Sequence, residues 1–334
     1  MISNQYIYNK QKYNNGKIFI GVPALDEHYL IDTIESAYDT AKYPDDIYFG
    51  ICSQKSGQNK FEDFSKYKNV RCIEVRHQYA IGAALSRMIA SSLHYDEKYY
   101  MQIDAHTIFA KDWDWYLKSD LNLLLKHVDK PIISQSIGSH TVDAYTDPER
   151  KRIKTFNGQE SYPFCLKKNI NNENIICIDK SRENEEKFLG KFLEHYFCMG
   201  GSGLFSLYNF IYDVSYNPWI YFNPEQEFTA LRSCTRGYRM FATSRTYVST
   251  LVKDNEYKKI YPNEGQENFN HLDNDYKNKV NFLKVYMTYE YLCGNSFGFN
   301  GAPDKNSYEE YINRSSVDYN EIAIIGENRK LKST

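Results

Sequence analysis

Short apolar runs alternate with helix-patterned segments through the first hundred residues, and this alternation restricts the possible folds most. The apolar runs occupy 18–23, 47–52 and 99–103, and 70–75 is a further expected strand that also carries Arg71 and Glu74. Residues 30–41 and 81–93 carry apolar side chains at three- and four-residue spacing, which predicts helices. Strands that are buried on both faces are typically unbroken apolar runs. We therefore expect an α/β protein with an open, mostly parallel central sheet and flanking helices.

Composition argues against several classes of protein. The 334 residues carry 41 basic and 43 acidic side chains, and a net charge of −2 does not favour a nucleic-acid binder. The N-terminus lacks the basic head of a secretory signal, and no run approaches the roughly 18 apolar residues of a membrane-spanning helix. The seven cysteines are scattered and never form C-x-x-C, which indicates reduced thiols. We expect a soluble, cytoplasmic protein without a membrane partner, in the host cytoplasm if the source is viral.

The chain divides by pattern into a tail, a main domain and an extension. Residues 1–16 are polar, and the strand and helix patterns begin at 17 and continue to 255. Within this domain, 139–195 is rich in Lys, Asn and Glu and lacks periodicity, so we expect an inserted region there. Residues 256–334 form a C-terminal extension, which we expect to pack on the main domain. It includes a helix predicted over 280–292.

The segment 99–106 is the most informative for chemistry, because an apolar strand ends directly in Asp104-Ala105-His106. Residues two apart in an extended chain point the same way, so Asp104 and His106 can face one point beyond the strand. Ligands of parallel sheets bind at this end of the strands. A carboxylate and an imidazole together suit a divalent cation such as Mn²⁺, which can bridge to a diphosphate. Alternatively, Asp104 caps the next turn and His106 lies on the surface.

Other motifs are weaker. Gly200-Gly201-Ser202-Gly203 resembles a glycine loop, but the chain has no dinucleotide-binding or P-loop motif. The run Glu225-Gln226-Glu227 fits either acid–base chemistry or an acidic helix N-terminus. Arg87 lies off the apolar stripe of its helix, which suggests a surface salt bridge. Four arginines within 14 positions offer either a diphosphate site or a solvated helix face; they are Arg232, Arg236, Arg239 and Arg245.

Six segments follow one another in a recognisable order. They are Ala41-Lys42-Tyr43-Pro44, Ala80-Ile81-Gly82 through Ser86-Arg87, Gln102 to His106 with Phe109 and Trp113-Asp114, Gly203-Leu204-Phe205, Pro224-Glu225-Gln226, and Arg232 to Tyr238. Together they resemble the N-acetylglucosaminyltransferases of the polypeptide-hydroxyproline type, which have the GT-A fold. The resemblance covers roughly residues 17–320. Each motif alone is weak, but six in order are fairly specific.

The resemblance implies a metal-dependent, retaining transfer of a GlcNAc-like sugar from a UDP-sugar to an acceptor hydroxyl. It implies a donor site, a metal site for Mn²⁺ or Mg²⁺, and catalytic residues near the sugar and the acceptor. Pro23, Ala24 and Asp26 would hold the uridine, and Arg76 and Arg87 would lie near the nucleotide. Asp104, which also faces the donor, and His106 would bind the metal. Glu225 and Gln226 would act in catalysis.

The chain departs from the family pattern in two places. Residues 247–252 lack the histidine that usually supplies a third metal ligand, so Asp254, His271, or diphosphate and water would complete the site. Gln226 replaces the second acid of the family's G-E-E motif. A protein hydroxyl is the default acceptor, and a hydroxymethylated DNA base or a surface glycan are alternatives. A catalytically inactive UDP-sugar-binding module is the alternative from a different class.

Overall fold

The computed structural model describes residues 15–55, 60–76, 82–134, 138–140, 165–167, 177–179, 192–195, 203–218, 225–243, 245–251 and 303–315. Strands in these ranges are β1 (Ile18–Leu25), β2 (Ile47–Lys55), β3 (Val70–Arg76), β4 (Tyr99–Gln102), β5 (Thr107–Phe109), β6 (Pro131–Ser134), β7 (Gly138–His140), β8 (Cys165–Lys167), β9 (Cys177–Asp179), β10 (Phe192–His195), β11 (Leu204–Leu207), β12 (Arg239–Thr243) and β13 (Val248–Leu251). Helices are α1 (Leu30–Thr40), the 3₁₀ turn η1 (Pro44–Asp46), α2 (Ala83–Ser91), α3 (Trp113–Leu124), α5 (Asn209–Asp213), α6 (Glu225–Cys234) and α9 (Lys305–Ser315).

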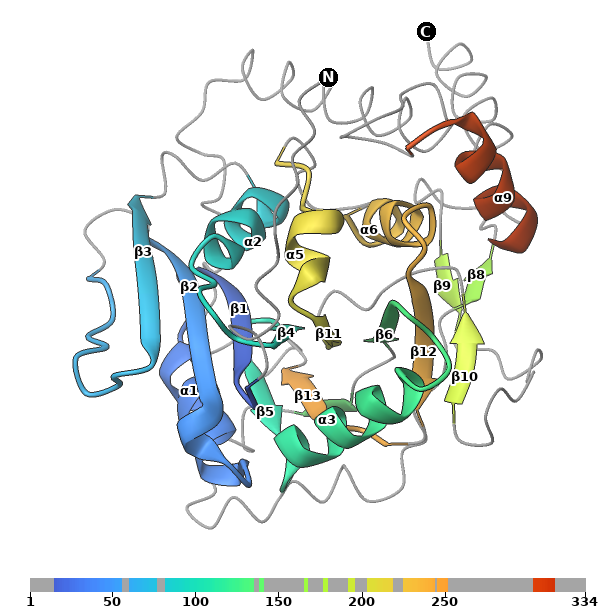
Figure 1. Ribbon diagram of the computed structural model, residues 1–334. Coiled ribbons are helices and arrows are strands. Elements are labelled where there is room, and N and C mark those ends of the chain that lie inside the picture. The colour runs from blue at the N-terminus through green and yellow to red at the C-terminus, as the bar shows by residue number, and fades with distance from the viewer. Residues whose placement is uncertain are drawn as a thin grey trace, which may run out of the picture.

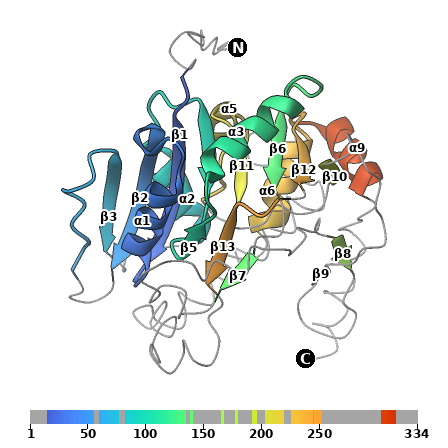
Figure 2. The same ribbon diagram turned by 90° about the horizontal axis from the view of Figure 1, so that it is seen from below.

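Within the described ranges, eight strands form one central sheet in the order β10-β12-β6-β11-β4-β1-β2-β3 (Figure 1). Pairing of neighbours shows that β1, β2, β3, β4, β6 and β12 run in one direction, whereas β10 and β11 run in the other. The carboxyl ends of those six strands therefore meet at one edge, which we name the carboxyl edge. A smaller sheet, β5-β13-β7, lies beside this edge (Figure 2).

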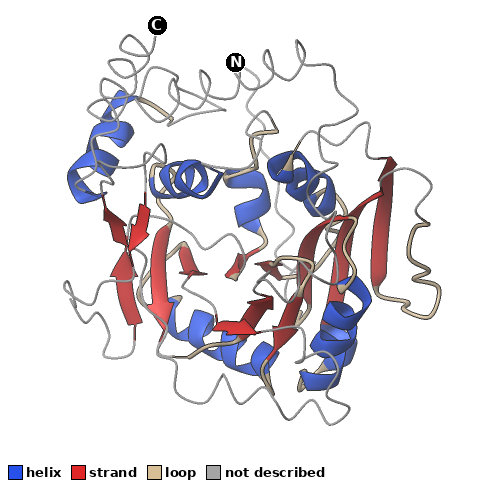
Figure 3. Ribbon diagram, turned by 180° about the vertical axis from the view of Figure 1, so that it is seen from behind, coloured by secondary structure: helices blue, strands red, loops and turns tan. Residues whose placement is uncertain are grey.

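Helices cover both faces of the central sheet, with α1 and α3 on one face and α2, α5 and α6 on the other (Figures 1 and 3). Side chains of the strands alternate between two buried clusters because successive residues of a strand point to opposite faces. Ile18 and Ile20 of β1 pack in the cluster that includes α1 and α3. Phe19 between them packs in the cluster that includes α2, α5 and α6. This double burial explains the unbroken apolar runs.

Helix α2 lies against β2 at Gly50. A Cβ atom on Gly50 would overlap the ring of Phe19 and would lie 2.6 Å from the carbonyl oxygen of Ala90 in α2. Only glycine therefore fits at this spacing between helix and sheet. Because α2 also carries Arg87, the close approach fixes how near Arg87 stands to the strands.

The expected α/β class, with a mostly parallel central sheet and flanking helices, is confirmed. Strand β2 continues three residues beyond its apolar run, and α2 is shorter at both ends than 81–93 predicts. In the described part of the chain, no helix combines the length and apolar character needed to span a bilayer. Helix α9 contacts α6, but the expected helix at 280–292 and most of 139–195 lie outside the described residues. The domain boundaries stay predictions.

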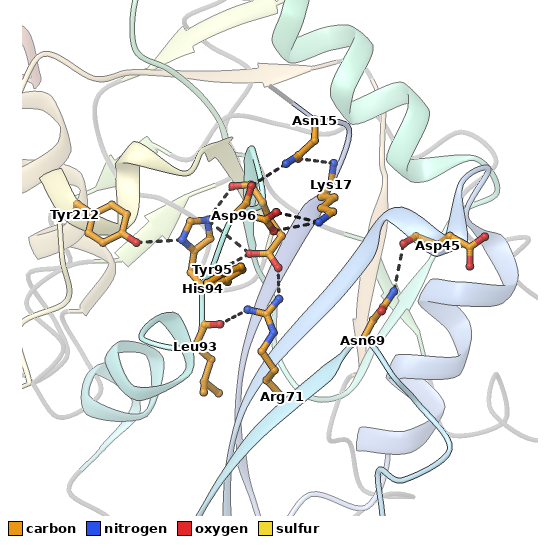
Figure 4. A network of polar contacts seen from close by, with 11 residues as sticks. Asn15, Lys17, Asp45, Asn69, Arg71, Leu93, His94, Tyr95, Asp96 and Tyr212 are labelled. Carbon is orange, nitrogen blue, oxygen red and sulfur yellow. Dashed lines mark hydrogen bonds and ion pairs between the residues drawn. The ribbon is translucent and has the colours of Figure 1, made fainter. Parts of the chain in front are cut away.

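A polar network closes the opposite edge of the sheet, where β1, β3 and β4 begin (Figure 4). Glu97 is fully buried and pairs with Arg71 of β3. His94 lies 2.8 Å from the carbonyl oxygen of Glu97 through Nε2 and 3.1 Å from the hydroxyl of Tyr212 through Nδ1. We name this set the Glu97 network. It joins the loop between α2 and β4 to β3 and to α5.

Candidate functional site

The segment between β4 and β5 carries Asp104 and His106, and hydrogen bonds hold its main chain. The hydroxyl of Thr33 in α1 donates to the carbonyl oxygen of Ala105 at 2.8 Å and accepts the N–H of Thr107 at 2.9 Å. The N–H of Leu251 in β13 donates to the carbonyl oxygen of His106 at 3.0 Å. The segment is therefore fixed by a helix on one face of the sheet and by the smaller sheet.

Exposure alternates along this segment. Ile103, Ala105 and Thr107 are buried, whereas the side chains of Asp104 and His106 are 30% and 18% exposed. The polar side chains thus lie on the open side of the segment, although the chain bends at Ala105 and His106. That Asp104 and His106 face one point stays a prediction.

Arg87 of α2 reaches Asp104. Its Nη2 lies 3.0 Å from Oδ1 of Asp104, and its Nη1 donates to the carbonyl oxygen of Ile103 at 3.3 Å. The side chain of Arg87 is only 6% exposed, so the expected surface salt bridge is wrong. The helical period could not show that Asp104, just after β4, neutralises the charge of Arg87 beside the strands.

Glu27, just before α1, reaches His106 from the other side. Its Oε2 lies 2.8 Å from Nδ1 of His106, and its Oε1 accepts the N–H groups of His28 at 3.1 Å and Tyr29 at 3.4 Å. The side chain of Glu27 is 4% exposed. Our sequence analysis missed this residue. Its only sequence signal is an acidic pair directly after the first apolar strand.

The residues expected to hold uridine lie at the carboxyl end of β1. Ala24 is buried in the core, so only its main chain can face a ligand, while Pro23 is partly exposed. Asp26 follows the strand with φ = 46°, and its N–H donates to the carbonyl oxygen of Gln54 at 2.9 Å. A non-glycine residue in the left-handed region is uncommon and often marks a functional turn. This turn lies at the carboxyl edge.

Arg76 ends β3 at the same edge. Its side chain is exposed, and its guanidinium carbon lies 4.7 Å from the ring centroid of Phe61. Beside it, Lys55 ends β2 and pairs with Glu62. The structure thus places Arg76 two strands away from β1, on the open side of the sheet edge.

Glu225 and Gln226 form the first turn of α6, and Gln226 is partly buried. This position confirms that the run begins a helix, which was the simpler of the two interpretations. Their expected role at the sugar and the acceptor stays a prediction.

The four arginines between 232 and 245 do not form one patch. Arg232 is 2% exposed and donates through Nε to a carbonyl oxygen at 2.6 Å, so it does not belong to a solvated face. Burial also lowers the pKa of Arg236. Arg232 contacts Val214, and Arg236 contacts the main chain of Arg232. Arg239 contacts Glu194, and Arg245 contacts the ring of Tyr116.

Asp104 and His106 offer an oxygen and a nitrogen, a donor set that suits Mn²⁺. Buried partners orient both side chains, as is usual for metal ligands. Over the described residues, no group of three or more His, Cys, Asp or Glu side chains could hold a metal ion. The suggested third ligands, Asp254 and His271, lie outside those residues. Among the described residues, a cation at Asp104 and His106 would have to take its other ligands from diphosphate and water.

Solved structures with similar folds share little sequence with this chain. A structure of GalNAc-T7 with UDP, GalNAc and Mn²⁺ has a TM-score of 0.48 and 12% identity over 71% of this chain, which spans 44% of that chain. Staphylococcus aureus TarS 1–349 has a TM-score of 0.42 and 11% identity over 89% of this chain and 78% of its own. Its complex with UDP-GlcNAc has a TM-score of 0.41 and 12% identity, with 89% and 79% covered.

No curated protein matches the chain. A family model described as "Glycosyltransferase (GlcNAc)" matches residues 56–320. The matched range includes Asp104 and His106, Arg87, and the first turn of α6, and it covers well over half of the chain. On this evidence the chain belongs to the glycosyltransferase (GlcNAc) family.

Proposed function

We propose that this glycosyltransferase moves a GlcNAc-like sugar from a UDP-sugar to an acceptor hydroxyl, with retention and with a divalent metal. One observation supports the proposal most directly. In a chain of this family, Asp104 and His106 extend from a fixed segment at the carboxyl edge, and buried partners orient both. A site built in this way suits a charged ligand because its polar groups are held before the ligand arrives.

The proposed reaction balances without any further reactant. The bond between the anomeric carbon and the β-phosphate oxygen breaks, and its electron pair stays on UDP. The acceptor oxygen bonds to the same face of that carbon, and its proton passes to a diphosphate oxygen. A bound Mn²⁺ would stabilise the charge that develops on the diphosphate. Asp104 and His106 would hold this ion, and Arg87 would keep Asp104 in place.

The remaining residues take their proposed roles from their positions. Strands β1, β3 and β4 run in the same direction, so the residues at their carboxyl ends share one edge of the sheet. We assign uridine binding to Pro23, Ala24 and Asp26, and contact with the nucleotide to Arg76. Glu225 and Gln226 would act at the sugar and the acceptor.

We take a protein hydroxyl as the acceptor, because the six ordered segments resemble the polypeptide-hydroxyproline type. The inserted region 139–195 would lie on the acceptor side of the domain, and 256–334 would pack on it. Incubation with isotope-labelled donor and separate protein, glycan and hydroxymethylated-DNA acceptors tests this choice. Label on DNA or glycan alone would contradict it.

Thermal unfolding with UDP and Mn²⁺ tests the donor site. A ligand at 100 times its Kd stabilises a protein by about 2.7 kcal/mol, so we expect a clear rise in the Tm of the wild type. Asp104→Ala should abolish this rise, as should a chelator. Asp129 is exposed and lies before β6 at the opposite edge, so Asp129→Ala is the matched control and should keep the rise in Tm. UDP binding that survives both Asp104→Ala and the chelator would show that the site assignment is wrong.

Turnover separates an enzyme from a binding module. We would measure UDP release from UDP-GlcNAc, UDP-GalNAc and UDP-glucose by the wild type and by Asp104→Ala. Release from one donor, lost in the variant, supports transfer from that donor. UDP binding without release from any donor, with acceptors present, would favour the inactive module.

A further inference from the structure

The contact between Glu27 and His106 has a feature that the proposed function does not yet use. Oε2 of Glu27 meets Nδ1 of His106 at 2.8 Å, and Oε1 accepts two main-chain N–H groups. Both oxygens of a nearly buried carboxylate are thus engaged, which fixes the orientation of the group. The side chain of Glu27 is 4% exposed and the ring of His106 is 18% exposed, so of these two side chains only His106 borders the open side.

This arrangement selects one tautomer of His106. The main-chain N–H groups of His28 and Tyr29 can only donate, so the carboxylate of Glu27 acts as an acceptor toward them. An ionised carboxylate also accepts from the imidazole, which places the ring proton on Nδ1. The lone pair of the neutral ring then lies on Nε2. A carboxylate that holds a histidine in this way commonly stands behind a metal ligand.

A local turn explains only half of the geometry. Oε1 of Glu27 accepts the N–H groups of the next two residues and so orders the turn before α1, whose N-terminus has no side-chain cap. The turn gives no reason for Oε2 to meet the ring of His106 in the segment after β4. The second contact therefore requires an account of its own.

We propose that Glu27 is a positioning residue, which fixes His106 as the Nδ1–H tautomer and presents Nε2 to the metal of the donor site. The inference rests on the proposed function, since that function supplies the metal. It adds a residue that acts through His106 and touches neither the donor nor the acceptor. Together with Arg87 on Asp104, it means that each ligand of the pair is oriented from a different face of the sheet.

The tautomer of His106 can be read directly. In full-length protein with isotope-labelled histidine, the two ring-nitrogen NMR signals of His106 are assigned by their loss in His106→Gln. We expect the wild type, without metal or nucleotide, to carry its proton on Nδ1. A proton on Nε2 would overturn the proposal. This measurement needs no variant of Glu27, so it decides the question even if such a variant does not fold.

Glu27→Gln gives a sharper test, because it should invert the tautomer. The amide oxygen stays with the N–H groups of His28 and Tyr29, so the amide NH₂ turns toward His106 and donates to Nδ1. The ring then carries its proton on Nε2, where the metal would bind. We expect Mn²⁺ affinity, measured by EPR with UDP present, to fall roughly 10- to 100-fold. Glu97→Gln, which changes a fully buried carboxylate at the opposite edge, is the matched control and should leave the affinity unchanged.

The outcomes separate the two proposals. A Glu27→Gln protein with lower Tm but unchanged tautomer and Mn²⁺ affinity would show that Glu27 only orders the turn before α1, which overturns the inference. Absence of Mn²⁺ binding by the wild type with UDP would contradict the metal-dependent function. In that case an inverted tautomer in Glu27→Gln would still establish that Glu27 positions His106.

Discussion

Asp104 and His106 each contact a partner that is more buried than they are. Arg87 supports Asp104, and Glu27 supports His106. The two exposed members follow a buried strand, so the sequence pattern could locate them. Their partners come from α2 and from the turn before α1, where the sequence shows one basic residue and one acidic residue without any shared spacing. Such partners become visible only once the sheet brings the elements together.

Arg87→Lys tests the support of Asp104. Lysine keeps the charge but cannot bind Asp104 and the carbonyl of Ile103 through a fork, so Asp104 should lose its fixed orientation. We expect affinity for UDP with Mn²⁺ to fall about tenfold, as for other residues that orient metal ligands. Isothermal titration measures the affinity, and urea unfolding measures the cost in stability, which we expect at about 1–2 kcal/mol.

The matched control is Arg239→Lys, which also breaks a guanidinium–carboxylate contact, at the start of β12. It should lower stability without a change in UDP affinity. If Arg87→Lys behaves like this control, Arg87 supports the fold alone and does not position Asp104 for the donor.

Two of the six ordered segments form one structural joint. The carboxylate of Asp114 in α3 is fully buried and accepts the N–H groups of Lys42 at 2.7 Å and Tyr43 at 3.1 Å. Beside it, Nε1 of Trp113 donates to the carbonyl oxygen of Ala37 in α1 at 3.1 Å. These contacts connect the end of α1 to α3 on one face of the sheet, which accounts for Lys42-Tyr43 and Trp113-Asp114 without any role in chemistry.

Asp114→Ala should destabilise the protein without affecting the site. It leaves the partly buried N–H groups of Lys42 and Tyr43 without their acceptor, and we expect a loss of about 2 kcal/mol in the free energy of unfolding. Asp114→Asn keeps one acceptor oxygen and should cost less. Urea unfolding gives the values, and UDP titration below the transition should match the wild type. A loss of UDP affinity in folded Asp114→Asn would mean that the joint also shapes the donor site.

Elements with a strong local pattern could be predicted, and their order in the sheet could not. The runs that form β1, β2 and β4 are apolar because both faces of the sheet are covered there, whereas β3 at the end of the sheet is partly exposed. Helix α1 follows a clear helical period. Strand β11, in contrast, is four residues long and enters between β4 and β6 in the opposite direction. Its place depends on pairing with residues about 70 to 100 positions away, which no local pattern encodes.

The two edges of the sheet differ across the whole molecule. At the carboxyl edge, polar side chains are partly exposed and oriented from both faces. At the opposite edge, the side chains of Glu97 and His94 are buried, and the Glu97 network joins β3, α5 and the α2–β4 loop (Figure 4). Ligands of open parallel sheets bind outside the carboxyl ends of the strands, where this protein has its partly exposed polar side chains. We expect the closed edge to contribute to stability and the other to binding.

His94 should make this stability depend on pH. Burial lowers the pKa of His94 below its ordinary value of 6.5, and Arg71 lowers it further, whereas Glu97 and Asp96 act in the opposite direction. As pH falls below about 6.5, unfolded chains take up a proton that folded ones do not, so the free energy of unfolding decreases. The decrease continues until pH reaches the lower folded pKa. Urea unfolding between pH 7.5 and 5 should show it, with a slope of at most ~1.4 kcal/mol per pH unit from this group.

His94→Gln removes the titrating group but keeps a side chain that can bond to Glu97 and Tyr212. It should be less stable than the wild type at neutral pH, since part of the network is lost, yet its stability should change less on acidification. The two curves therefore converge as pH falls, whereas loss of packing alone would keep them parallel. His127→Gln, at an exposed position, is the control and should follow the wild type. Parallel curves for His94→Gln would show that His94 contributes by packing and does not link folding to proton uptake.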